Sequence, residues 1–298
     1  MTEIGPFITI SPRDYDAVLF DLDGVLTRTA SVHAAARKRL FNAFLEQRAA
    51  DTGEAFVPFD IDVDYRRYVD GKPRYDGVSS FLAARGIALP FGSPADGPEA
   101  QTVCALGNRK DRYFTEHLEQ HGVEVYEEAI ALVQTLRAQE IKTAVVSSSN
   151  NCAAVLEAAG ISQLFDTRVD GKDITRLGLN GKPAPDAFLE GAQRLQAEPS
   201  HTVVVEDAIA GVEAGRAGCF GLVIGVDHSG QSQALREAGA DVVVITLAQV
   251  KVTVEPPSAW SLVYEGFDPA REGIRACRRN SRVSTCASAT AGIHSTCG

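Results

Sequence analysis

Short apolar runs rich in β-branched residues alternate along the chain with segments of helical spacing. The apolar runs cover residues 17–20, 142–146, 202–205, 220–226 and 241–245. Between them, apolar residues recur every three or four positions over residues 127–139, 151–159, 185–195, 209–217 and 231–238. The first pattern predicts buried strands and the second predicts amphipathic helices. Because strand and helix alternate, we expect an α/β fold with a parallel sheet that helices cover on both faces.

The stretch from about residue 28 to residue 122 breaks this alternation. It contains helix-like segments at residues 31–48, 78–85 and 109–120, without a convincing strand. We therefore expect a helical cap over residues 28–122, inserted after the first strand. The catalytic core would then consist of residues 14–27 and 123–248.

Composition narrows the class of protein. The chain has 298 residues, 45% of them hydrophobic, and a net charge of -10 without a basic stripe, which argues against a nucleic-acid partner. No apolar run approaches the roughly 20 residues of a membrane span, and the start of the chain lacks a signal-peptide pattern. We expect no membrane partner and a cytoplasmic location. Cys104, Cys152 and Cys219 lack metal-ligand spacing, so we interpret them as reduced thiols.

Two carboxylates follow the first apolar run, where residues 17–20 lead directly into Asp21-Leu22-Asp23. Side chains alternate along a strand, so Asp21 and Asp23 can share one face at the carboxyl end of the sheet, where open α/β sheets hold ligands. One carboxylate can attack phosphorus and the other can move a proton to or from the leaving oxygen. An acidic turn after a strand is the simpler interpretation of this pair alone.

Two further polar clusters follow expected strands. Ser147 begins the run Ser-Ser-Ser-Asn-Asn, where its hydroxyl can donate to a phosphoryl oxygen beside a helix start. Lys182 lies between a glycine and Pro183-Ala184-Pro185, which would fix a cation in a loop and aim it inward. A serine cap and a solvated lysine are the corresponding structural alternatives.

Adjacent acids, Glu206 and Asp207, end the apolar run at residues 202–205. Carboxylate oxygens are the hard ligands that Mg²⁺ prefers. The simpler interpretation is an acidic helix start, which the helix dipole favours.

Taken in order, these four clusters resemble the four motifs of the haloacid dehalogenase superfamily, and their spelling resembles its β-phosphoglucomutase branch over residues 14–248. The resemblance implies a Rossmann-like core with a helical cap. It also implies that Asp21 is the nucleophile that becomes an aspartyl phosphate, that Asp23 is the general acid and base, and that Ser147 and Lys182 hold the transferring phosphoryl group. The ligands implied for Mg²⁺ are Asp21, the backbone carbonyl of Asp23, Asp207 and Glu206.

The same resemblance extends into the expected cap. Arg74 in Gly-Lys-Pro-Arg matches the arginine that clamps the phosphate not being transferred. His33 and Lys110 match a histidine and a lysine near the reacting sugar, although an exposed helix residue and a solvated charge are equally good interpretations. Ser149 and Asn151 match further substrate-binding positions.

Two positions depart from the mutase pattern. Arg28 places a cation at the entry to the cap, where the branch usually has aspartate, so cap closure is expected to be tuned differently. Asn150 stands where typical mutases have lysine, so the distal phosphate loses one positive charge. Arg74 is therefore expected to carry more of the distal binding.

The end of the chain differs from the core. Residues 251–257 have a linker composition, and residues 260–269 resemble the opening of inverting maltose and trehalose phosphorylases, which release β-glucose 1-phosphate. We expect residues 249–275 to be a linker and phosphorylase-like remnant, and residues 276–298 to be a disordered tail from a truncated or frame-shifted fusion. A fused or co-encoded disaccharide phosphorylase is the expected partner.

The sequence thus predicts Mg²⁺-dependent phosphoryl transfer on a hexose phosphate, with β-phosphoglucomutase, which converts β-glucose 1-phosphate to glucose 6-phosphate, as the leading function. The alternative is a sugar-phosphate phosphatase, with trehalose 6-phosphate as one candidate substrate. A non-enzymatic module attached to a phosphorylase is a third hypothesis, which the intact acidic and basic residues disfavour.

Overall fold

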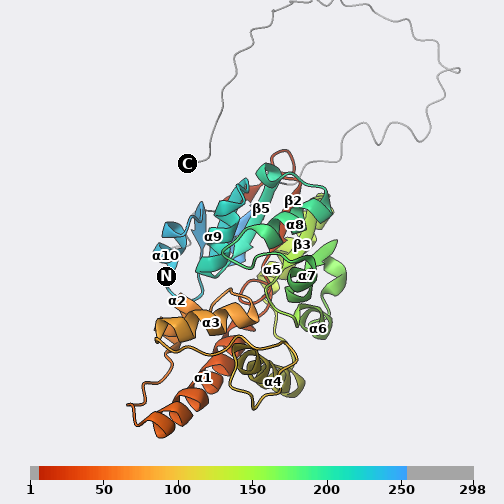
Figure 1. Cartoon of the computed structure of the whole chain (residues 1–298). Helices are drawn as coiled ribbons and strands as arrows, with labels where there is room; N and C mark the ends of the chain where they lie inside the picture. The colour runs from red at the N-terminus through yellow and green to blue at the C-terminus, as the bar shows by residue number, and fades with distance from the viewer. Residues whose placement is uncertain (1–6, 254–298) are drawn as a thin grey trace, which may run out of the picture. The chain divides into compact units, whose positions relative to one another are not determined.

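The computed structural model describes residues 7–253, and its centre is a six-stranded parallel sheet with strand order β4-β3-β2-β5-β6-β7 (Figure 1). The expected phosphorylase-like segment at residues 260–269 and the expected tail lie outside the described residues. The strands of the sheet are β2 (Ala17–Phe20), β3 (Lys142–Val146), β4 (Thr167–Val169), β5 (Thr202–Glu206), β6 (Leu222–Val226) and β7 (Val242–Val244). All pairs in the sheet are parallel. The predicted α/β fold class is confirmed.

Helices cover both faces of this sheet. Along β2, Val18 and Phe20 belong to one hydrophobic cluster, and Ala17 and Leu19 belong to the other. The covering helices are α5 (Glu127–Ala138), α6 (Cys152–Ala158), α7 (Gly171–Leu177), α8 (Asp186–Leu195), α9 (Ile209–Ala217) and α10 (Ser232–Glu237). Because both faces of each central strand are buried, the strands are apolar throughout rather than alternating.

A second, two-stranded parallel sheet joins the two ends of the described chain. Strand β1 (Ile8–Ile10) pairs with β8 (Val250–Val252), and Ile10 is fully buried. Sequence analysis placed the core boundary at residue 14 and began the linker at residue 249, so both short strands lie beyond the expected core. Three-residue strands are too short to show a recognisable pattern in the sequence.

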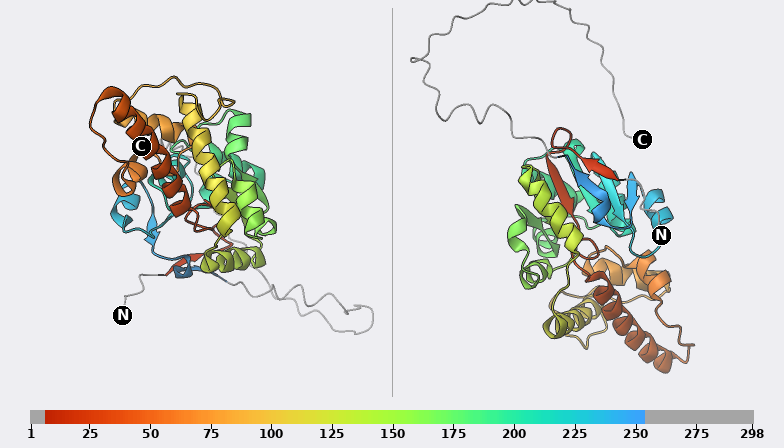
Figure 2. Two further views of the ribbon diagram at one scale, coloured as in Figure 1. Left: turned by 90° about the horizontal axis from the view of Figure 1, so that it is seen from below. Right: turned by 180° about the vertical axis from the view of Figure 1, so that it is seen from behind.

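The helical insertion gathers beyond one end of the sheet (Figure 1). Its long helices are α1 (Ala30–Thr52), α3 (Arg74–Ala84) and α4 (Val103–His121). One turn of π-helix, η1 (Ile61–Tyr65), and the short α2 (Arg66–Tyr68) lie between α1 and α3. Helices α1 and α4 lie side by side (Figure 2). The insertion has its own apolar core, in which the rings of Phe41, Phe59 and Phe81 pack with centroids 4.2–4.9 Å apart.

Short 3₁₀ turns complete the described chain, at η2 (Ser162–Leu164), η3 (Pro199–His201) and η4 (Leu247–Gln249). Between residues 7 and 253, no helix combines the length and the apolar character needed to cross a bilayer.

Candidate active site

Asp21 is the first residue after β2, at the carboxyl edge of the sheet. Its amide donates to the carbonyl of Val205 over 2.9 Å, so the chain is still paired to β5 at this point. The residue is only 6% exposed, and its Oδ2 accepts a 2.9 Å hydrogen bond from the amide of Asp23. Pairing to the sheet therefore fixes the carboxylate of Asp21 at the floor of a cavity.

Lys182 is the cation that faces Asp21. Its Nζ lies 2.5 Å from Asp21 Oδ1, and it also donates to Glu206 Oε1. Burial alone would lower the pKa of this amine, but the two carboxylates outweigh burial and raise it. Lys182 therefore stays charged and partly neutralises the acids around it.

Glu206 and Asp207, at the end of β5, complete an acidic cluster with Asp21. Within the described chain, one potential ligand atom from each of the three carboxylates lies within 4.8 Å of the others. Glu206 Oε2 accepts the amides of Asp207 and Ala208, each over 2.9 Å, which fixes that side chain. Burial, with repulsion from Asp70, Glu206 and Asp21, raises the pKa of Asp207 well above its usual range.

This cluster fits a divalent cation, because hard oxygen donors crowd around one point with less positive charge than they need. The absence of a side chain at Gly24 leaves room for the carboxylate of Asp207. Gly24 has a φ of +95°, and a Cβ there would lie 1.8 Å from Asp207 Oδ2, so a side chain would push this carboxylate out of place.

Asp23 faces His33 from α1. Its Oδ1 lies 3.2 Å from His33 Nε2 and accepts a hydrogen bond from Thr29. Burial acts to raise the pKa of Asp23, but the contacts with His33 and Thr29 and the charge of Lys110 outweigh it and lower that pKa to about 2. Asp23 is therefore a carboxylate at neutral pH in this conformation.

The serine-rich loop after β3 places three of its side chains at the cavity and buries another outside it. Ser147 is 1% exposed, and its Oγ accepts the amide of Ser149 over 3.1 Å. Ser148, Ser149 and Asn150 line the cavity, whereas Ser147 lies outside its lining. Ser148 Oγ also donates to the carbonyl of Gly71 in the insertion over 2.9 Å.

Arg74, at the start of α3, does not reach Asp21 but pairs with Asp111 of α4 over 2.7 Å. The same Asp111 oxygen accepts a 2.7 Å hydrogen bond from Asn151 Nδ2, at the start of α6. Asp111 therefore joins the insertion to the core. It also pairs with the guanidinium of Arg74, which sequence analysis assigned to the phosphate that is not transferred.

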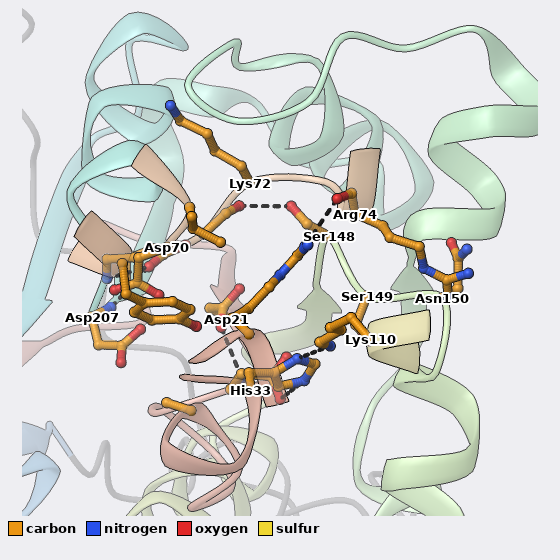
Figure 3. A pocket seen from close by; sticks show the side chains of 18 of the residues that line it. Asp21, His33, Asp70, Lys72, Arg74, Lys110, Ser148, Ser149, Asn150 and Asp207 are labelled. Carbon is orange, nitrogen blue, oxygen red and sulfur yellow. Dashed lines mark hydrogen bonds and ion pairs between the residues drawn. The ribbon is translucent and has the colours of Figure 1, made fainter. Parts of the chain in front are cut away.

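The cavity lies between the carboxyl edge of the sheet and the helical insertion (Figure 3). Figure 3 shows Asp21, His33, Lys110, Ser149 and Asp207 around it. Its volume is about 70 Å³, whereas pockets that hold small-molecule ligands span roughly 300–1,000 Å³. In this conformation the cavity is therefore smaller than a sugar phosphate requires.

Sequence analysis missed four charged residues that line this cavity, Arg37, Asp70, Lys72 and Asp111. Arg37 lies one turn after His33 on α1, and the residue is 4% exposed. Asp70 precedes α3, and burial, together with Glu206, raises its pKa to about 6. The spacing of Arg37 four residues after His33 was the signal available, because such residues share a helix face. No pattern in the sequence distinguishes Asp70.

Comparison with known proteins assigns the family. The model of the haloacid dehalogenase-like hydrolases matches residues 15–218. The chain belongs to this family. It is 47% identical over 242 residues to a β-phosphoglucomutase of Mycobacterium bovis, a match that covers 80% of this chain and 92% of the relative. The predicted superfamily and branch are confirmed, and the chain is an enzyme of this phosphotransferase group.

Two other similarities extend this comparison. The fold matches the crystal structure of β-phosphoglucomutase from Clostridium difficile with a TM-score of 0.62 and 25% identity, over 79% of this chain and 92% of that one. The chain is also 40% identical over 248 residues to an uncharacterised glycosyl hydrolase of Mycobacterium tuberculosis. That match covers 83% of this chain but only 18% of the glycosyl hydrolase.

Proposed function

We propose that this protein is a Mg²⁺-dependent β-phosphoglucomutase, which converts β-glucose 1-phosphate to glucose 6-phosphate through a bisphosphate. The observation that carries the proposal is the pairing of two carboxylates with different partners at one cavity. Lys182 faces Asp21, whereas His33 and Thr29 face Asp23. Different environments for two neighbouring acids suit a nucleophile and a proton carrier.

Asp21 is the proposed nucleophile. In the proposed cycle a phosphoryl group is carried on Asp21 Oδ1 or Oδ2, and a hydroxyl of the bound sugar phosphate attacks its phosphorus atom. Lys182 neutralises the charge that builds on the transferring oxygens, with Ser147 as the proposed hydroxyl donor. When the P–O bond to Asp21 breaks, the carboxylate is regenerated and the sugar holds two phosphates.

Asp23 is the proposed proton carrier. Because its pKa is about 2, Asp23 is deprotonated at neutral pH and can take the proton from the attacking sugar hydroxyl. The bisphosphate then reorients in the site so that its other phosphate faces Asp21. Asp21 attacks that phosphate, and the carboxylic acid of Asp23 returns the proton to the leaving sugar oxygen. His33, held against Asp23, is a positioning residue in this scheme.

Asp21, Asp207 and the backbone carbonyl of Asp23 are the proposed Mg²⁺ ligands, with Glu206 in or next to the same shell. A bound divalent cation would supply charge stabilisation for the transferring phosphoryl oxygens. Removing divalent cations with a chelator should therefore abolish turnover, and adding Mg²⁺ should restore it.

Arg74, Lys110, Ser149 and Asn151 are the proposed substrate-binding residues. We also propose that the enzyme works in the cytoplasm, where sugar phosphates are made and used, beside a fused or co-encoded disaccharide phosphorylase. The match to a much longer glycosyl hydrolase supports that partner.

The test is product analysis with β-glucose 1-phosphate, Mg²⁺ and a trace of glucose 1,6-bisphosphate. We expect glucose 6-phosphate as the main product. We also expect no turnover by Asp21→Asn, which lacks the nucleophilic oxygen pair but keeps its shape, with the fold monitored by circular dichroism. Release of inorganic phosphate alone would replace the mutase by the sugar-phosphatase alternative, and near-normal activity of folded Asp21→Asn would overturn both.

A further inference from the structure

Arg37 is a buried cation whose hydrogen bonds are incomplete. It lies on α1, and its Nη2 donates to the backbone carbonyl of Arg74 over 2.9 Å. Its Nη1 is buried and has no hydrogen-bond partner among the described residues. A guanidinium carries five N–H donors, and leaving one of its nitrogens buried without an acceptor costs free energy. Burial lowers the pKa of Arg37 to about 10, so it remains a cation at neutral pH.

Arg37 lines the same cavity as Asp21 and Asp23. The insertion brings four cations to this cavity, Arg37, Lys72, Arg74 and Lys110, but only two carboxylates, Asp70 and Asp111. The carboxylate of Asp111 is already shared between Arg74 and Asn151 of the core. This wall of the cavity therefore has unbalanced positive charge and a free N–H donor, which together suit an anion.

The opposite loop of the core, residues 147–151, contains no cation. The arginine on α1 therefore offers a charge that the core loop lacks.

We propose that Arg37 is a ligand of the distal phosphate, the one that is not being transferred, and that its free Nη1 binds an oxygen of this phosphate beside Arg74. This inference rests on the proposed function, because it requires a substrate with two phosphates or with a phosphate away from the reacting one. The distal site is then built from two arginines of the insertion.

The test compares two substrates that differ in the distal phosphate. p-Nitrophenyl phosphate has only the phosphoryl group that is transferred, whereas glucose 1,6-bisphosphate has both. The Mg²⁺-loaded full chain is assayed for the release or transfer of phosphate from each. We expect Arg37→Met to change kcat/KM for p-nitrophenyl phosphate by less than about twofold, and to lower it for the bisphosphate by about tenfold or more through KM.

Two further variants separate charge from packing. Arg37→Gln keeps an N–H donor for the Arg74 carbonyl and removes the charge, so it should behave like Arg37→Met. Arg37→Lys keeps the charge and should recover part of the affinity for the bisphosphate. Arg39→Met changes an exposed arginine two residues further along α1 and should leave both substrates unchanged.

Equal losses with both substrates in the charge-removing variants would overturn the proposal and leave Arg37 as a packing residue. Unchanged use of the bisphosphate would overturn it as well. The outcome is separate from the mutase question, because an enzyme that only hydrolyses the bisphosphate still reports its affinity for the distal phosphate.

Discussion

Lys110 Nζ lies 2.5 Å from Nδ1 of His33, so this lysine of the insertion contacts the imidazole at the ring nitrogen that does not face Asp23. A lysine ammonium can only donate, so Nδ1 accepts, and Nε2, which lies 3.2 Å from Asp23 Oδ1, carries the ring hydrogen. Burial first, and then the charge of Lys110, lower the pKa of His33. A neutral His33 of fixed tautomer thus connects two residues that sequence analysis could only list separately.

This contact predicts a pH dependence. Burial, with repulsion from Arg37, lowers the pKa of Lys110 to about 7, so this side chain loses its proton as the pH rises through neutrality. We expect kcat/KM for β-glucose 1-phosphate to fall above about pH 7, because the free enzyme then loses a cation that faces the sugar phosphate. Lys110→Arg keeps its charge and should move this fall to higher pH. A flat profile of the wild type from pH 6 to pH 9 would contradict the assignment.

Lys182 predicts a large effect on stability. Replacing it by methionine leaves Asp21 and Glu206 buried without their cation, which should lower the free energy of unfolding by on the order of 3 kcal/mol near neutral pH. Burial already raises the pKa of Asp21, and the loss of Lys182 should raise it further. A carboxyl with a raised pKa in the folded state favours folding at low pH and disfavours it as the pH rises.

The stability deficit of Lys182→Met should therefore be larger at pH 8 than at pH 5. Urea unfolding at both pH values, in the absence of divalent cations, provides the measurement. Lys172→Met removes an exposed lysine and serves as the control, with an expected change within about 0.5 kcal/mol. Equal stability of wild type and Lys182→Met would show that Lys182 does not balance the acids.

The sheet could be predicted because burial on both faces leaves long apolar runs in the sequence. Strands β3 and β5 lie within one residue of their expected ends. Strand β4 was missed because Thr167, Arg168 and Val169 form no apolar run, although they pair with β3 in the sheet. The helices of the insertion were found, but they begin earlier than expected. Helix α4 begins at Val103 after the Thr102 cap, six residues before the expected start.

The candidate site was predictable where function requires charged residues at the ends of strands, as at Asp21 and Glu206, whereas Lys182 lies between α7 and α8 rather than after a strand. Asp21 and Lys182 are 161 positions apart, yet the resemblance to a family brought them together before their contact was known. Contacts that cross from the insertion to the core were not predictable. The hydrogen bond between Asn151 and Asp111 joins the start of α6 to α4. The relative placement of these two helices depends on the packing of the whole insertion.

The paired strands β1 and β8 predict the effect of truncation. Sequence analysis began the linker at residue 249, but a chain ending at Gln249 would lose Val250–Val252, the only partner that β1 has in the described sheets. Val250 is 5% exposed and packs in the same cluster as Ile10. A chain ending at Gln249 should lose about 3–6 kcal/mol, because burial of these two side chains contributes roughly 1.5–3 kcal/mol each.

A chain ending at Thr253 keeps β8 and is the matched control. It should unfold at the same temperature as the full chain, and thermal unfolding measured for all three chains decides the question. If the chain ending at Gln249 is as stable as the control, the pairing of β1 with β8 does not contribute to the fold.

The last prediction separates mutase from phosphatase at the distal phosphate. A mutase must hold both ends of a bisphosphate, so the distal cations matter more to it than to a hydrolase. Arg74→Ala removes the guanidinium that Asp111 holds at 2.7 Å, and it should lower formation of glucose 6-phosphate by about tenfold or more, equivalent to roughly 1.5–3 kcal/mol for a lost charged hydrogen bond. Slow release of inorganic phosphate should survive better.

Asn150 lines the cavity, so Asn150→Lys should restore a distal cation and raise mutase flux relative to hydrolysis. The readout is the ratio of glucose 6-phosphate to inorganic phosphate, with Arg39→Ala as the exposed control. If the wild type releases only phosphate and neither substitution alters the ratio, the site is that of a sugar phosphatase.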